Sequence, residues 1–389
     1  MSTHFAHRIP RLSNWAMISL FFLAILSPSL RMLTSPIVWW SSRENRVLAT
    51  MPPAPKSIGD FIAWRAEIDN FLKDHFGFRE FYIKLYHETL RLFNVMPVSV
   101  PVLQGLDGWY FFTLFHMIDD FYGRIPLSDT QLQTWIEAQK ARKRWLGERG
   151  IHYLLLIAPN KQSIYPQMLV PNALAMRGQS RYDQLLAKLG GETPDFMPDL
   201  QRIFKAYADK PSSPLLYYKT DTHWNDLGAY LAFGEIMKKL SAWFPDTNFK
   251  TDFLIIPQVK RGSGDLAKMM MRSDLGEISP MLAPARRHFK ILPLSYPISD
   301  IPREPDRPSF LTRLPDPGNR PRALIFRDSF FVPMVPLLAE NFSEILFIWK
   351  GYDQKNVEEA LKYFKPDVVI EEIVERAMFD FLLSPKEQP

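Results

Sequence analysis

The chain begins with an uncharged, mostly apolar run between Arg11 and Arg31. Arg8 and Arg11 precede the run, and no acidic residue occurs before Glu44. A bilayer is crossed by about 17 to 25 residues, and the small-x-small pattern of a signal-peptide cleavage site is not clean here. The pattern therefore predicts a signal anchor over residues 1–33, with the N-terminus in the cytoplasm and the body of the protein outside. A cleaved signal peptide and a buried helix are the alternatives.

The next two segments differ in pattern. Residues 34–57 are dense in proline, which blocks regular helix, so we expect a stalk. Over residues 58–100 apolar residues recur at helical spacing, with Gly77 as an interruption. This spacing predicts a helical lead-in packed on a main domain, which we place at residues 101–389.

The pattern of the main domain alternates. Asp107 and Gly108, between apolar runs, predict a hairpin, and residues 128–150 predict a long helix. Short β-like runs then alternate with helical patterns or loops, at residues 153–158, 215–219, 323–326, 344–349 and 367–370. Such alternation predicts an α/β fold with a doubly wound, mainly parallel sheet. Residues 251–319, rich in proline, predict a long irregular insertion.

Composition narrows the class of protein. Of the 389 residues, 47% are apolar and 23% charged, as in an ordinary folded protein. The net charge is +5, but the charges are interspersed, which disfavours nucleic acid as a partner and permits an anionic glycan. The chain has no cysteine, so disulfides and thiolate chemistry are excluded. We find no coenzyme A or nucleotide motif and predict no cofactor.

The polar residues after three of the runs carry candidate chemistry. In open α/β sheets, ligands bind beyond the carboxyl ends of the strands. A serine needs an imidazole to take its proton, and the imidazole needs a carboxylate to fix its tautomer. Asp221 and His223 follow one run, and on an extended segment their side chains would point the same way, about 6.5 to 7 Å apart along the backbone. We predict Ser329 as nucleophile, His223 as base and Asp221 as orienting carboxylate, with free N–H groups near Ser329 for an oxyanion.

Four neighbouring residues are candidates for binding substrate. They are Asn160, Lys161, Trp224 and Arg327. Each has a plainer alternative, since Asn160 also suits a turn, Lys161 a solvated loop and Trp224 simple packing. The Asp-x-His pair could instead hold a metal, but no third histidine or carboxylate stands at a telling spacing, so we predict no metal site.

Five motifs, in order, resemble the alginate O-acetyltransferase family with its SGNH-hydrolase-like domain. They are Gly105-Leu106-Asp107-Gly108-Trp109-Tyr110-Phe111, Ala158-Pro159-Asn160-Lys161, Asp221-Thr222-His223-Trp224-Asn225, Gly264-Asp265-Leu266-Ala267 and Arg327-Asp328-Ser329-Phe330. The resemblance implies an SGNH-like sheet, a serine acyl-enzyme and acetyl transfer to a polysaccharide. Arg327 stands where the wider SGNH superfamily usually has glycine, a departure that concerns the oxyanion hole.

From these observations we expect an O-acetyltransferase that modifies hydroxyls of an exported polysaccharide. We expect it at the periplasmic or extracytoplasmic face of the inner membrane, anchored by its N-terminal helix. The resemblance implies a multi-spanning membrane acyltransferase as the acetyl donor. The alternatives are a polysaccharide acetyl esterase with the same triad, or a non-catalytic glycan-binding scaffold of an export complex. Alginate, cellulose and other exopolysaccharides all remain open as the polymer.

Overall fold

The structure is a computed structural model that describes residues 8–41, 46–92, 101–251, 253–283, 287–301 and 307–380. The chain divides into two units. The N-terminal unit comprises residues 1–100 with 268–272, and the main unit comprises residues 101–267 with 273–389.

The N-terminal unit is largely helical. Its elements are α1 (Arg8–Thr34), β1 (Trp40–Ser41), β2 (Arg46–Val47), α2 (Ile58–Asp74) and α3 (Arg79–Leu92). Within α1, the stretch from Asn14 to Thr34 is long and apolar enough to cross a membrane by length and composition. The predicted break at Gly77 separates α2 from α3. A Cβ at Gly77 would lie 1.9 Å from the Pro28 carbonyl oxygen of α1, so only glycine permits this approach.

The main unit is built on a sheet with the strand order β5-β12-β10-β11-β9-β8. The strands are β5 (His152–Ala158), β12 (Val368–Val374), β10 (Arg322–Arg327), β11 (Glu344–Trp349), β9 (Phe310–Arg313) and β8 (Lys290–Pro293). The first four run parallel, β9 is antiparallel to β11, and β8 is antiparallel to β9. The predicted α/β fold with a mainly parallel sheet is therefore confirmed.

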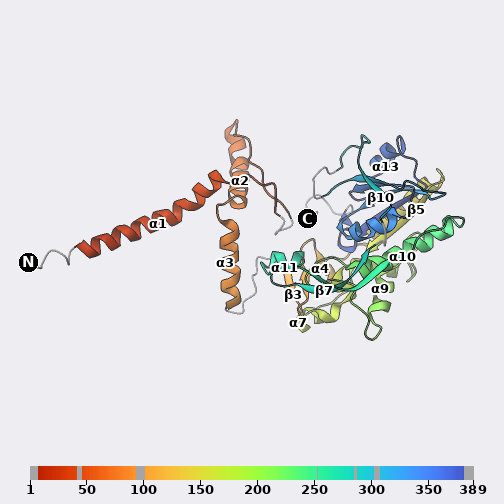
Figure 1. Ribbon diagram of the computed structural model, residues 1–389, viewed down its shortest axis with the longest axis horizontal. Helices are drawn as coiled ribbons and strands as arrows, with labels where there is room; N and C mark the ends of the chain where they lie inside the picture. Colours follow the sequence, from red (N-terminus) through yellow and green to blue (C-terminus); the bar gives the residue numbers. More distant parts are fainter. Residues whose placement is uncertain are drawn as a thin grey trace, which may run out of the picture. The chain divides into compact units, whose positions relative to one another are not determined.

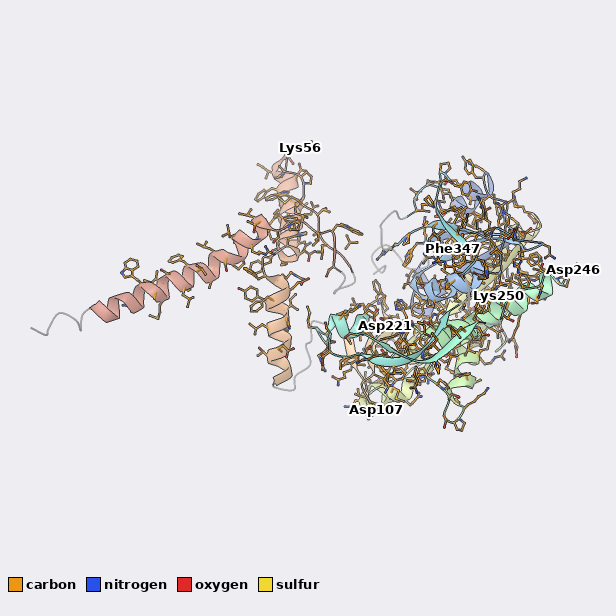
Figure 2. The ribbon with its side chains drawn as sticks, viewed as in Figure 1. Lys56, Asp107, Asp221, Asp246, Lys250 and Phe347 are labelled. Carbon is orange, nitrogen blue, oxygen red and sulfur yellow. The ribbon has the colours of Figure 1, made fainter. Side chains whose placement is uncertain are left out.

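Alternate residues of each strand face opposite sides of this sheet, as the period of two requires. In β10, Ala323 and Ile325 join one hydrophobic cluster, whereas Leu324 and Phe326 join another. Helices cover both faces of the sheet. The helices on the first face are α9 (Leu200–Ala208), α10 (Asp226–Trp243), η2 (Ser329–Met334) and α12 (Val335–Ala339). The helices on the second face are α5 (Asp129–Gly147), α8 (Arg181–Lys188) and α13 (Gln354–Leu361). Figure 1 shows α10 and α13 on opposite sides of β5 and β10. Side chains fill the unit densely around the fully buried Phe347 (Figure 2).

Smaller elements surround the sheet. They are β3 (Val102–Gln104), β4 (Tyr110–Phe112), α4 (Met117–Phe121), α6 (Lys161–Ile164), η1 (Pro166–Met168), α7 (Pro171–Ala175), β6 (Leu254–Arg261), α11 (Asp265–Met269), β7 (Glu277–Ala283) and η3 (Glu375–Ala377). The predicted hairpin is formed by β3 and β4, and Asp107 and Gly108 have positive φ in its turn. The predicted long helix is α5, which begins with a capping box at Ser128.

Two expectations about the main unit were wrong. Residues 215–219 form no strand of the sheet, and Tyr217 makes only an isolated bridge to Trp224. Residues 251–319 are more regular than predicted, because β6 pairs with β7, and β8 with β9 extend the main sheet. Proline did not prevent this. Pro257 lies in an irregularity of the β6–β7 pairing, and Pro293 ends the edge strand β8, both positions where a missing N–H is tolerated.

Candidate active site

Ser329 lies at the carboxyl end of a central strand. It follows β10 by two residues and begins η2. Asp328 shapes this corner, because its Oδ1 accepts the Phe330 N–H at 2.7 Å and its Oδ2 accepts the Val374 N–H at 3.0 Å. The corner is thereby fixed both to its own helical turn and to the end of β12. The Phe330 N–H is thus taken, and the Ser329 N–H has no hydrogen-bond acceptor among the residues that the structure describes.

Asp221 and His223 lie in a tight bend. The Asp221 Oδ1 accepts the backbone N–H of His223 at 3.0 Å and also contacts the imidazole Nδ1 at 2.7 Å. An aspartate that bonds the backbone two residues ahead forms an Asx turn, so the extended geometry that we expected here was wrong. The two side chains nevertheless meet, because the turn brings the carboxylate to the edge of the ring.

The bend and the corner come together through the histidine. The His223 Nε2 lies 2.8 Å from the Ser329 Oγ, so the three predicted residues form a continuous chain of hydrogen bonds. A neutral imidazole that donates from Nδ1 to Asp221 leaves Nε2 free to accept the serine O–H. This is the arrangement that a general base requires.

The charges of the bend shift the pKa values of its groups. Burial disfavours the imidazolium, but the hydrogen bond and the charge of Asp221, together with the charge of Asp265, raise the pKa of His223 above its ordinary value. Burial would raise the pKa of Asp221, but the His223 ring and two backbone N–H groups hold that pKa below its usual range. Burial and the neighbouring Asp221 raise the pKa of Asp265. Asp221 therefore stays ionised while His223 titrates.

The Lys161 ammonium group holds the backbone of the bend through hydrogen bonds. Its Nζ donates to the carbonyl oxygens of Tyr218 at 2.9 Å, Lys219 at 3.1 Å and Asp221 at 2.6 Å. Burial lowers its pKa to about 8 despite the nearby carboxylates. Glu277 of β7 accepts the N–H groups of Lys219 and Thr220. Side chains therefore satisfy part of this backbone, and the Tyr110 N–H of β4 donates to the Lys219 carbonyl oxygen at 2.9 Å, so residues 215–219 find their partners outside the main sheet.

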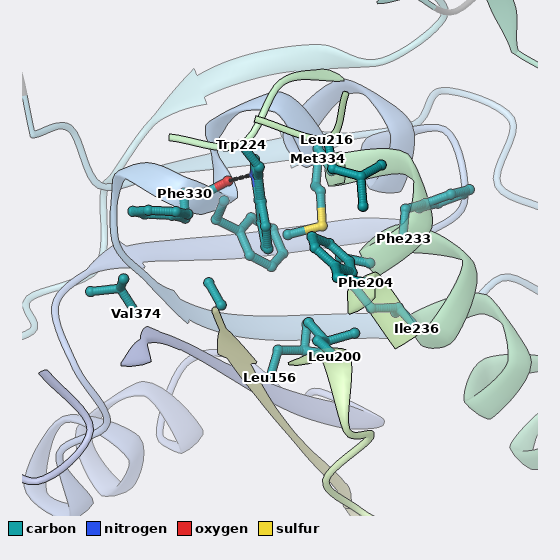
Figure 3. Packing of buried hydrophobic residues seen from close by; sticks show 14 of the residues in the cluster. Leu156, Leu200, Phe204, Leu216, Trp224, Phe233, Ile236, Phe330, Met334 and Val374 are labelled. Carbon is teal, nitrogen blue, oxygen red and sulfur yellow. Dashed lines mark hydrogen bonds between the residues drawn. The ribbon is translucent and has the colours of Figure 1, made fainter. Parts of the chain in front are cut away.

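Trp224 joins the bend to the nucleophile corner. Its Nε1 donates to the Phe330 carbonyl oxygen at 2.8 Å, and its ring packs against Phe330 and Phe204 (Figure 3). Arg327 stacks on Trp349 and donates to the carbonyl oxygens of Pro308 and Asp328.

Asn160 lies between the end of β5 and the first residue of the short helix α6. Its N–H donates to Glu375 at 2.7 Å, and its buried Oδ1 has no partner among the described residues. Asn160, Lys161, Trp224 and Arg327 each have at most 2% of their surface exposed. The structure thus gives these four residues supporting contacts and little surface for a sugar, and their binding of substrate stays a prediction.

The sequence placed Asp265, the first residue of α11, in the fourth of the five motifs but assigned it no role in the site. Its carboxylate, Asp221 and His223 offer three metal-ligand atoms within 4.8 Å of one another, so a third possible ligand, a second carboxylate, does approach the Asp-x-His pair. Both nitrogens of His223 already have hydrogen-bond partners, and a metal ion at Nδ1 would have to displace the 2.7 Å contact with Asp221. The geometry therefore suits proton transfer better than metal binding.

Comparisons with known proteins bear on this site. Residues 102–288 match the family described as "SGNH hydrolase-like domain, acetyltransferase AlgX". A segment of 131 residues is 28% identical to the probable alginate O-acetylase AlgJ of Pseudomonas aeruginosa, and it covers 33% of this chain and 30% of the length of that relative.

Two solved structures are similar to this chain, and one of them has a TM-score above 0.5. Bacillus cereus PatB1 is 16% identical, with a TM-score of 0.52 over 73% of this chain and 100% of that one, which shows the fold alone. The O-acetyltransferase domain of Pseudomonas putida AlgJ is 18% identical, with a TM-score of 0.44 over 74% of this chain and 97% of that one, too low a score to carry an argument.

Proposed function

We propose, from the premise that this chain is an alginate O-acetyltransferase-like protein with an SGNH-hydrolase-like domain, that it acetylates hydroxyls of an exported polysaccharide through an acyl-enzyme on Ser329. One observation carries the proposal, namely the hydrogen-bond chain from Asp221 through His223 to Ser329, with contacts of 2.7 and 2.8 Å. A scaffold that only binds glycan has no need of a serine aligned on a half-buried imidazole-carboxylate pair.

The reaction follows from this geometry. The Ser329 Oγ attacks the acetyl carbonyl carbon of the donor while His223 Nε2 takes the serine proton, and the imidazolium then protonates the leaving oxygen of the donor. In the second half, a sugar hydroxyl attacks the acetyl carbonyl carbon of the ester, His223 takes its proton, and that proton returns to the Ser329 Oγ as the ester bond breaks. Asp221 stabilises the imidazolium in both halves. The Ser329 N–H, at the start of η2, is placed to donate to the oxyanion.

The proposal extends to location and partners. The apolar part of α1 supports an anchor in the inner membrane, with residues 101–389 as the catalytic domain in the periplasm, after the stalk (residues 34–57) and the helical lead-in (residues 58–100). Because acetyl-CoA is cytoplasmic, a multi-spanning membrane acyltransferase would pass the acetyl group outward. An esterase would use the same triad with water in place of the sugar hydroxyl, and the acceptor decides between the two activities.

The test uses the full chain in detergent with a chromogenic acetyl ester, followed by leaving-group release and by intact mass. We expect the unaltered protein to gain one acetyl group and to release the chromophore, and Ser329→Ala to do neither, with a loss of rate on the order of 10³-fold or more. Alginate and cellulose oligosaccharides are then added as acceptors. Acetylated sugar supports transfer, whereas free acetate alone supports the esterase. Equal turnover by Ser329→Ala would exclude the acyl-enzyme.

A further inference from the structure

We infer that Asp265 is a positioning residue for the triad, which holds the Asp221 carboxylate in place and adds a second negative charge beside the His223 imidazole. The inference deepens the proposed function and rests on it. Asp265 lies far from Asp221 and His223 in the sequence and reaches them from the first position of α11.

Asp265 contacts the bend through both its backbone and its side chain. Its N–H donates to the Asp221 Oδ2 at 3.0 Å, the oxygen that His223 does not use. Its own Oδ1 accepts the Thr222 N–H at 2.7 Å, so it also holds the residue between Asp221 and His223. The orienting carboxylate is therefore gripped at both oxygens, and its rotation about χ2 is blocked.

The second oxygen of Asp265 faces the imidazole. Its Oδ2 lies 3.9 Å from the His223 Nδ1, close enough for its charge to favour the imidazolium without displacing the 2.7 Å contact with Asp221. The imidazolium that forms when Ser329 loses its proton thus meets two carboxylates rather than one.

Other charged groups also act on this ring. The charge of Arg376, which lies over the Phe330 ring, opposes protonation of His223. The Lys161 ammonium interacts with both Asp221 and Asp265, and Glu277 interacts with Lys161. Arg376 thus acts against Asp221 with a positive charge near the ring. A second carboxylate offsets that charge.

Gly264 allows the segment before Asp265 to lie close to the bend. A Cβ at this position would lie 2.4 Å from the Thr220 carbonyl oxygen and 2.6 Å from the Asp221 Cβ. The loop before α11 therefore comes close enough to place Asp265 only because residue 264 has no side chain.

The test compares Asp265→Asn with Glu277→Gln in the full chain. Asparagine keeps an Oδ1 acceptor for Thr222 and the backbone donor to Asp221 but removes the charge. Glu277→Gln is the matched control, because Glu277 also holds the backbone of this segment, at Lys219 and Thr220, yet has no contact with the imidazole in the described structure.

We expect Asp265→Asn to lower kcat for the acetyl ester on the order of tenfold with little change in KM. Removing a negative charge beside the imidazolium lowers the pKa of His223, so the acid limb of kcat/KM should move about one pH unit lower. Glu277→Gln should leave that limb in place. If Asp265 has only a structural role, Asp265→Asn should lower kcat/KM at every pH without moving the acid limb. That result would overturn the inference.

A second readout does not depend on turnover. The His223 imidazole can be titrated by NMR in histidine-labelled protein, with its signal assigned by its absence in His223→Gln. A lower pKa in Asp265→Asn supports the inference, and an unchanged pKa refutes it. Failure of the proposed function would appear instead as turnover by Ser329→Ala, so the two failures are distinguishable.

Discussion

The nucleophile corner, Asp328 to Phe330, and the base bend, Asp221 to His223, reach the same site by different means. The corner continues a buried parallel strand, and its position follows from the sheet. The bend belongs to no strand, and its backbone is held by the side chains of Lys161, Glu277 and Asp265. The strand provides half of the site through backbone pairing, whereas buried polar side chains build the other half. The bend should therefore be the more fragile half.

Replacing Lys161 breaks the bend most directly. Lys161→Met leaves the half-buried carbonyl oxygens of Tyr218 and Asp221 without a donor, whereas that of Lys219 keeps the Tyr110 N–H, and each such loss costs about 1 to 3 kcal/mol. We expect kcat/KM to fall on the order of a hundredfold or more and Tm to fall by at least about 5 °C. Turnover of the acetyl ester and thermal unfolding measure the two effects.

Lys219 provides the control for that substitution. Its Nζ donates to a single carbonyl oxygen, that of Asp107, at an exposed position. Lys219→Met should leave both rate and Tm close to those of the unaltered protein. Equal effects of the two substitutions would contradict the special role of Lys161.

Trp224 sharpens the comparison, because it connects the two halves. Trp224→Phe removes the donor to the Phe330 carbonyl oxygen, which we expect to cost about 1 to 3 kcal/mol of stability and on the order of tenfold in kcat. Trp135 makes an equivalent 2.8 Å bond to the Met378 carbonyl oxygen in the other hydrophobic cluster. Trp135→Phe should therefore lose similar stability with little change in kcat. Chemical denaturation and ester turnover of both variants test this, and a parallel loss of kcat would argue against a connecting role.

The smallest expected effect concerns pH. His223 must be neutral to take the serine proton, and its pKa is raised above the ordinary 6.5. Activity should therefore fall as pH drops through a value above 6.5, while Asp221, with its lowered pKa, stays ionised. Initial rates of ester turnover from pH 5 to 9 measure the limb. A plateau that continues below pH 6 would contradict the assignment of His223 as base.

The same contrast explains what the sequence could predict. Short apolar runs identified β5, β10, β11 and β12, and Asp107 with Gly108 identified the β3–β4 hairpin, because these patterns are local. The pairing of β8 with β9 was hidden among prolines that occupy edge and irregular positions.

In the candidate site, residue types pointed to Ser329, His223 and Asp221, and sheet topology placed Ser329, but the strand expected to carry Asp221 and His223 to the same edge does not form. The Asx turn and the approach of Asp265 depend on contacts between distant segments, so spacing alone could not reveal them. The burial of Lys161 was missed for the same reason, since its three acceptors lie more than fifty residues further along the chain.

The bond from Trp224 to Phe330 has a consequence for the order of events in a turnover. His223 and Trp224 are consecutive, as are Ser329 and Phe330, so the two hydrogen bonds form adjacent rungs between the same two segments. In the proposed acyl-enzyme the Ser329 oxygen has lost its hydrogen, and the first rung is broken. The second rung is untouched by the chemistry and holds the segments in register, so the base is still in place when the acceptor arrives.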